Sequence, residues 1–140
     1  KICCYAQGFE LLKKAAAEYG WVLDFGQIAM IWREGWIIRA DFLEDIKAAY
    51  DQGEVSNLML TSKFKKELLD AQKSWRRIVC HIVNSGIYAP ALTSTLNYFD
   101  GYRCERTSAN LTQAQRDFFG AHTYERTDRE GIFHTIWEEE

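Results

Sequence analysis

The sequence predicts an all-α fold, an irregular multi-helix domain over residues 1–120 followed by an extended C-terminal arm over residues 121–140. Apolar residues recur at alternating steps of three and four along most of the chain, which is the spacing of one helix face. The 140 residues include one proline and nine glycines, which favours helices over a turn-rich β fold. The helical spacing stops after Gly120, where the arm begins.

Glycines divide the predicted domain into helices, because glycine suits the left-handed position that ends many helices. The expected stops are, in chain order, Gly20, Gly35, Gly53, Gly86 and Gly120. The first helix is expected from Ile2 to Tyr19, and the longest over residues 62–85. A further helix is expected to begin at Pro90, since a missing amide donor costs nothing in the first turn of a helix.

Polar side chains mark where three of these helices begin. The predicted cap residues are Asp24, Thr61 or Ser62, and Asn110. Asp24 and Asn110 are each followed three residues later by a glutamine, which is the spacing of a capping box.

The arm contains a turn cluster at residues 128–131 and ends in Ile-Phe-His-Thr-Ile-Trp before three glutamates. Phe133, Ile136 and Trp137 are large apolar side chains, which rarely stay on a free tail in water. We therefore expect residues 121–140 to dock on another surface, within the chain or on a partner subunit.

Composition excludes several classes of function. The formal net charge of −3, from 17 basic and 20 acidic residues, gives no general attraction to nucleic acid. No stretch of about 18 apolar residues occurs, so no membrane span is expected. There is no Gly-x-Gly-x-x-Gly and no P-loop, so this chain alone does not build the usual nucleotide cradle.

The cysteines predict neither a disulfide framework nor a metal site. Cys3, Cys4, Cys80 and Cys104 show no Cys-x-x-Cys spacing, and zinc sites need such ordered pairs. Cys80, its neighbour His81 and Cys104 are expected to be structural core residues, because free cysteine is commonly buried. Free thiols are typical of a reducing compartment, so a cytoplasmic location is expected.

Two groups of basic side chains are candidate ligand sites. Arg76 and Arg77 follow Trp75 in the longest helix, where salt bridging or snorkelling beside an apolar stripe is the favoured explanation. Arg116 and His122 flank a helix end in an aromatic segment. Arginine offers a planar fork for phosphate or carboxylate oxygens, and histidine can donate to another oxygen or titrate near neutrality. On residue types alone, a structural role is the commoner explanation for this pair as well.

The string Gln-Ala-Gln-Arg-Asp-Phe-Phe-Gly-Ala-His-Thr-Tyr-Glu at residues 113–125 resembles a signature near the C-terminus of 6-phosphogluconate dehydrogenases. Other blocks are similar to the same family and occur in the same order. They lie at residues 5–9, 28–33, 37–39, 74–77, 98–103, 110–111 and 133–137. The resemblance covers essentially the whole chain.

The resemblance implies a part of an oxidoreductase of the pentose phosphate pathway. Family members oxidatively decarboxylate 6-phosphogluconate to ribulose 5-phosphate with NADP, or in some members NAD. They are homodimers of a Rossmann domain, a large helical domain and a tail that passes into the partner subunit. By resemblance, Arg116 holds the substrate phosphate and His122 hydrogen-bonds the substrate from the same side, in the active site of the opposite subunit.

The resemblance also implies what this chain lacks. The family's dinucleotide fingerprint, lysine base and glutamate acid lie upstream of the position of Lys1. No catalytic residue is therefore expected here, no cofactor contact is assigned, and NADP is expected to be bound mainly by the N-terminal domain. The chain begins without methionine or helix cap, so a fragment of a longer protein, inactive by itself, is expected.

Two other hypotheses stay open. In the first, the chain is a purely structural helical dimerisation module with no ligand site, and Arg116 and His122 are polar groups at an interface. An anion bound at Arg116 separates this hypothesis from the enzymatic one. In the second, Arg76 and Arg77 bind RNA, which the net charge of −3 disfavours.

Overall fold

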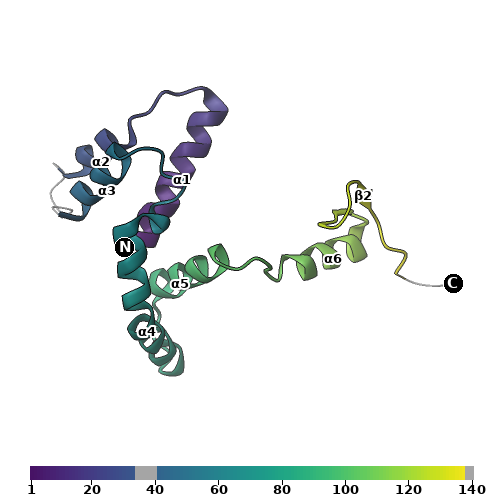
Figure 1. Cartoon of the computed structure of the whole chain (residues 1–140). Helices are drawn as coiled ribbons and strands as arrows, with labels where there is room; N and C mark the ends of the chain where they lie inside the picture. Colours follow the sequence, from purple (N-terminus) through teal and green to yellow (C-terminus); the bar gives the residue numbers. More distant parts are fainter. Residues whose placement is uncertain (34–40, 138–140) are drawn as a thin grey trace. The chain divides into compact units, whose positions relative to one another are not determined.

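The computed structural model describes residues 1–33 and 41–137, and in these ranges the chain is mainly helical (Figure 1). The elements are α1 (Ile2–Tyr19), α2 (Phe25–Arg33), α3 (Asp41–Asp51), η1 (Leu58–Leu60), α4 (Ser62–Asn84), α5 (Pro90–Tyr102), α6 (Ala109–Gly120), β1 (Tyr124–Glu125) and β2 (Ile132–Phe133). The predicted all-α class is confirmed. The chain divides into two compact units, Lys1–Phe99 and Asp100–Glu140.

In the first unit, α1 buries one stripe of side chains at steps of three residues, namely Cys3, Ala6 and Phe9. The helix ends at Gly20, which has a φ of 66°. Both predicted ends of this helix are confirmed. A side chain at Gly20 would meet no other atom, so its left-handed backbone is the reason that glycine stands there.

Helices α2 and α3 lie side by side. The Oδ1 atom of Asp24 accepts a hydrogen bond of 2.9 Å from the backbone N–H of Gln27, as the predicted cap requires. The predicted stop at Gly35 and the predicted start of the third helix lie outside the described residues. Helix α3 ends at Asp51, close to the predicted stop at Gly53.

The core of the first unit joins these helices to η1, which the sequence did not predict. Its largest fully buried apolar side chains are Phe9, Phe64, Leu43, Ile46 and Leu58. Asn57 is buried and its Oδ1 accepts from Met59 N at 2.9 Å, which begins the turn. The Nζ of Lys13 donates to the carbonyl oxygens of Val55 at 2.9 Å and Ser56 at 2.6 Å, tying the connecting segment to α1.

Helix α4 has the predicted extent, and its N-cap residue is Thr61, one of the two predicted, but Thr61 makes no capping hydrogen bond. Thr61 occupies the capping position, yet its hydroxyl donates back to the carbonyl oxygen of Leu58 at 2.9 Å and leaves the helix amides without a side-chain partner. The helix is followed by Gly86, with a φ of 64°, and α5 begins at Pro90 as predicted. None of the described helices is long and apolar enough to cross a membrane.

The second unit contains α6 and a short antiparallel hairpin that pairs Tyr124 with Phe133. The predicted cap of α6 is wrong, because the helix begins at Ala109 and Asn110 bonds only the adjacent amide, Leu111 N, at 2.8 Å. The predicted stop is displaced by one residue, since Ala121, with a φ of 48°, takes the left-handed position after Gly120. The described part of the predicted arm, residues 121–137, contains the hairpin.

Candidate functional site

The end of α6 brings Arg116 and His122 together. The Nη2 atom of Arg116 lies 2.8 Å from Nε2 and 3.1 Å from Nδ1 of the His122 ring. Its Nη1 donates to Oε1 of Gln113 at 3.3 Å, one turn back along the helix. Both Arg116 and His122 are exposed. The two candidate residues that the sequence selected are thus neighbours in space as well as in sequence.

A strained turn carries His122 back toward the helix. The residues on either side of it, Ala121 and Thr123, have φ angles of 48° and 63°. Left-handed backbone is uncommon for alanine and an outlier for a β-branched residue such as threonine. Such strain persists only where surrounding contacts impose it, and it is frequent at functional sites. The contacts that impose it here come from Asp117.

Asp117 is the only buried residue of α6 and is completely enclosed, at 0% exposure. Its Oδ1 accepts from Thr123 N at 3.0 Å and from His134 Nδ1 at 2.8 Å. Its Oδ2 accepts from Thr135 N at 2.9 Å and from Trp137 Nε1 at 3.1 Å. A carboxylate has four lone-pair sites, and all four are used here. One side chain therefore fastens both the turn of His122 and the end of the arm to α6.

The ionisation of Asp117 follows from these contacts. Burial by itself would raise the pKa of this carboxyl, because it disfavours the charged form. Hydrogen bonds from His134, Thr135 and Trp137 outweigh burial and lower the pKa to about 2. Asp117 is therefore a carboxylate at neutral pH, and it can act as an acceptor but not as a proton donor.

Further contacts hold the hairpin together. The hydroxyl of Tyr124 lies 2.7 Å from Oγ1 of Thr135, and the guanidinium of Arg129 lies 4.5 Å from the centre of the Phe133 ring. Arg126 donates to both oxygens of Asp128, at 2.8 Å and 2.6 Å. These hydrogen bonds lower the pKa of Asp128 to about 2. The hairpin is thus held together by contacts among its own residues.

The partners of Arg116 leave its charge uncompensated. Among the residues that the structure describes, its hydrogen bonds go to Gln113 and His122, and no carboxylate pairs with it. A guanidinium N–H only donates, and an imidazole has at most one acceptor nitrogen, so only one of the two ring nitrogens can accept from Nη2. An exposed arginine fork that no described carboxylate pairs with is suited to binding phosphate or carboxylate oxygens.

Sequence reasoning did not identify Asp117 and His134 as parts of the site. Both stand in blocks that carried the family resemblance, but aspartate on a helix is most often a solvated side chain. The available signal was the sequence Arg-Asp-Phe-Phe-Gly followed by an arm rich in donors, His-Thr-x-Trp. Only the folded structure reveals that these donors return to one carboxylate.

The other candidates of the sequence do not assemble into a site. In the ranges 1–33 and 41–137, no three His, Cys, Asp or Glu side chains are placed to hold a metal ion together. The expectation that Cys80, His81 and Cys104 are core residues is wrong, because all three side chains are exposed. Cys3 is buried. Arg77 donates to Oγ of Ser74 at 3.5 Å on its own helix.

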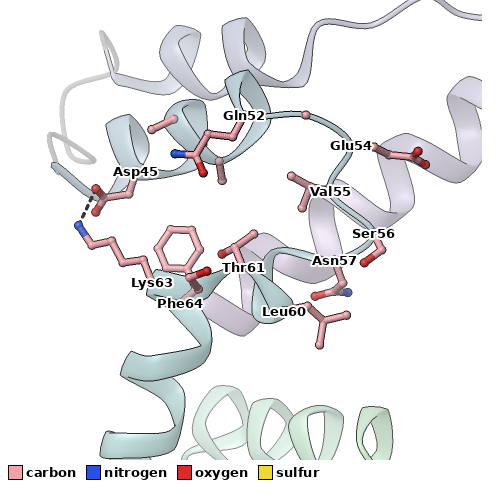
Figure 2. A pocket seen from close by; sticks show the side chains of 14 residues that line it. Asp45, Gln52, Glu54, Val55, Ser56, Asn57, Leu60, Thr61, Lys63 and Phe64 are labelled. Carbon is pink, nitrogen blue, oxygen red and sulfur yellow. Dashed lines mark ion pairs between the residues drawn. The ribbon is translucent and has the colours of Figure 1, made fainter.

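A hollow of about 450 Å³ lies between the end of α3, the segment 52–57 and the start of α4. Figure 2 shows Asp45 and Lys63 pointing toward one another at its edge, and their charged atoms are 2.6 Å apart. Asn57 in its wall is buried and bonded to Met59 and Tyr98. Because Asp45 and Lys63 pair with each other and the buried Asn57 is bonded to neighbours in the fold, we assign this hollow to the packing of the first unit.

The fold and the site define an all-α domain that presents an exposed arginine–histidine pair at the end of α6. Residues 1–137 match the family model described as "6-phosphogluconate dehydrogenase, C-terminal domain". The chain therefore belongs to the 6-phosphogluconate dehydrogenase family, and the resemblance seen in the sequence is confirmed.

Similar proteins agree with this membership. The chain is 56% identical over 138 residues to "6-phosphogluconate dehydrogenase, decarboxylating 2" of Arabidopsis thaliana, covering 98% of the chain and 28% of that protein. It is 54% identical to "6-phosphogluconate dehydrogenase, NADP(+)-dependent, decarboxylating" of Bacillus subtilis, covering 98% and 29%. The chain thus spans less than a third of the length of these relatives.

A solved structure resembles the chain closely. Plasmodium falciparum 6-phosphogluconate dehydrogenase superimposes with a TM-score of 0.90 at 44% sequence identity, over 97% of this chain and 29% of that one. That enzyme has been solved in its apo form, in complex with its cofactor NADP+ and in complex with its substrate 6-phosphogluconate.

Proposed function

We propose that this chain is the C-terminal part of an NADP-dependent, decarboxylating 6-phosphogluconate dehydrogenase, and that it supplies Arg116 and His122 to hold the substrate. The observation that carries the proposal is the exposed contact of 2.8 Å between these two side chains. No described carboxylate neutralises the guanidinium of Arg116, whose other partner is Gln113. The substrate offers a phosphate dianion at one end. A planar arginine fork binds such an oxyanion by two parallel hydrogen bonds.

The relatives support this substrate and cofactor. The Bacillus subtilis relative is named as NADP(+)-dependent, and the Plasmodium falciparum enzyme has been solved with 6-phosphogluconate. NADP accepts the hydride in such a reaction, and we expect it to be bound mainly by domains outside this chain. The residues that move protons are likewise expected outside it, so the chain alone is expected to be inactive.

The part played by Arg116 is then one of binding energy and placement. The phosphate of 6-phosphogluconate is remote from the carbon that loses hydride and from the carboxylate that is released. Energy gained by holding a remote group is used to place the reacting end of a substrate. His122, on the same side, is expected to hydrogen-bond the substrate once the substrate oxygens compete for the guanidinium.

A homodimer with shared active sites is the proposed assembly, with residues 121–140 of the second unit docking on the partner subunit. Apolar side chains of this unit that face solvent support an interface, because monomers rarely expose such groups together. They include Leu111 at 70%, Phe118, Phe119 at 77%, Ile132 and Ile136 at 84% exposure. The proposed location is the cytoplasm, which the four free cysteines favour.

Kinetics of the complete dehydrogenase test the proposal. Replacing Arg116 by alanine should raise KM for 6-phosphogluconate about 10- to 100-fold, the loss expected for one or two charge-assisted hydrogen bonds. Arg116→Lys should recover only part of this, because lysine lacks the fork. Arg129→Ala removes the same charge from the same unit without touching Arg116, and it should leave KM unchanged. An unchanged KM in Arg116→Ala would overturn the proposal.

The purely structural alternative also draws support from the exposed apolar side chains of the second unit. The two functions differ in what they expect at Arg116. Soaking crystals with 6-phosphogluconate or sulfate should place an anion on its guanidinium if the residue binds substrate. A site that stays empty at high ligand concentration, in crystals where Arg116 faces solvent, would favour the dimerisation module.

A further inference from the structure

We propose that Asp117 is a positioning residue, which holds His122 against Arg116 by accepting the backbone N–H of Thr123. The inference rests on the proposed function, because it concerns how the proposed substrate-binding pair is set in place. Asp117 does not face the solvent and touches neither His122 nor the guanidinium of Arg116 by its side chain. Its action is therefore expected to be indirect.

The two oxygens of the Asp117 carboxylate accept hydrogen bonds from different sets of donors. The first, Oδ1, accepts from Thr123, the residue directly after His122, and from His134. The second, Oδ2, accepts from Thr135 and Trp137, both in the last part of the arm. One oxygen thus serves the turn that carries His122, and the other serves the arm.

The turn needs this support because its backbone is unfavourable. Ala121 and Thr123 both adopt positive φ angles, a left-handed backbone that is unfavourable for side chains other than glycine. A backbone hydrogen bond runs from Ala121 N to the carbonyl oxygen of Asp117 at 2.8 Å, so the same residue holds the turn from both ends. Without the bond to Thr123, the turn is expected to relax and to carry His122 away from Arg116.

Replacing Asp117 by asparagine should separate the two tasks. An asparagine keeps one acceptor oxygen and turns the other into an NH₂ donor. Thr135 N and Trp137 Nε1 can only donate, so the amide oxygen is expected to take the place of Oδ2. The NH₂ group then faces Thr123 N–H and repels it, while His134 can change tautomer and accept. The arm stays bonded and the turn is released.

The test measures KM and kcat for 6-phosphogluconate in the complete dehydrogenase. Asp117→Asn should raise KM about tenfold, the size of one lost charge-assisted hydrogen bond, and should leave kcat within about twofold. Asp128→Asn is the matched control. It removes a carboxylate from the hairpin of the same unit, where Asp128 pairs with Arg126, and it should change neither constant.

A His122→Ala background distinguishes positioning from general support of the fold. If Asp117 acts through His122, Asp117→Asn should raise KM little further once His122 is absent. A full additional tenfold rise would contradict the inference, as would an unchanged KM in Asp117→Asn alone. If His122→Ala and Arg116→Ala themselves leave KM unchanged, the proposed function has failed instead. Circular dichroism of each variant verifies that the helices persist.

Discussion

The carboxylate of Asp117 and the imidazole of His134 meet at 2.8 Å, although 17 positions separate them along the chain. The carboxylate is enclosed, whereas the histidine side chain is 44% exposed. Because a carboxylate only accepts, Nδ1 of His134 must carry the hydrogen in this contact. The contact attaches the arm to α6, the helix that carries Arg116. Asp117 therefore bonds both the arm and the turn that contains His122.

Acid should release the arm within a defined pH range. The folded pKa of Asp117 is about 2, below the value of about 3.9 for an unfolded aspartate, so ionised Asp117 stabilises the folded unit above about pH 4. This stability is lost as pH falls through the folded pKa, between about pH 4 and pH 2. The indole N–H signal of Trp137 in NMR spectra should mark the change, since that group donates to Asp117.

Two variants control the acid titration. Asp128 also has a folded pKa of about 2, so Asp128→Asn should leave the Trp137 transition in place. Asp117→Asn should abolish it, because the amide does not titrate. A Trp137 transition in wild type with a midpoint above about pH 5 would show that another group controls the arm.

Exchanging alanine and glycine should have opposite effects at two left-handed helix ends. Ala121→Gly removes strain of about 1–2 kcal/mol and adds flexibility worth about 0.4–1 kcal/mol to the unfolded chain. The midpoints of these ranges give a net gain in the free energy of unfolding of about 0.8 kcal/mol. Gly20→Ala introduces the backbone strain and removes the flexibility of the unfolded chain. It should therefore lower the free energy of unfolding by a similar amount. Gly20 has a φ of 66° and open space around it, so no clash contributes.

Urea unfolding followed by circular dichroism measures both changes on the 140-residue chain. Gly86→Ala, at another left-handed glycine with open surroundings, is expected to behave like Gly20→Ala. Destabilisation by Ala121→Gly would mean that the left-handed turn before His122 is not strained.

The helices could be predicted because their signals are local. The apolar stripe of α1 and the glycine after it lie within twenty residues, and both ends of the helix were found. Caps were less predictable, since a hydroxyl has several backbone partners within reach. Thr61 turns back to Leu58, and Asn110 bonds only its neighbour.

The site was predictable only in part. Arg116 and His122 are close in sequence, and the family resemblance selected them. The role of Asp117 was not predictable, because its hydrogen-bond partners lie 6, 17, 18 and 20 positions away in the sequence, beyond the spacing of any helical or strand pattern. The strands β1 and β2 contain two residues each, too few for an alternating pattern to appear.

The central claim is that Arg116 recognises the phosphate of the substrate. The most direct measurement compares the binding of 6-phosphogluconate and gluconate, which lacks the phosphate, to the complete dehydrogenase and its Arg116→Ala variant. We predict that the variant weakens binding of 6-phosphogluconate about 10- to 100-fold and changes that of gluconate less than about twofold. An equal loss for both ligands, or no loss for either, would contradict this claim.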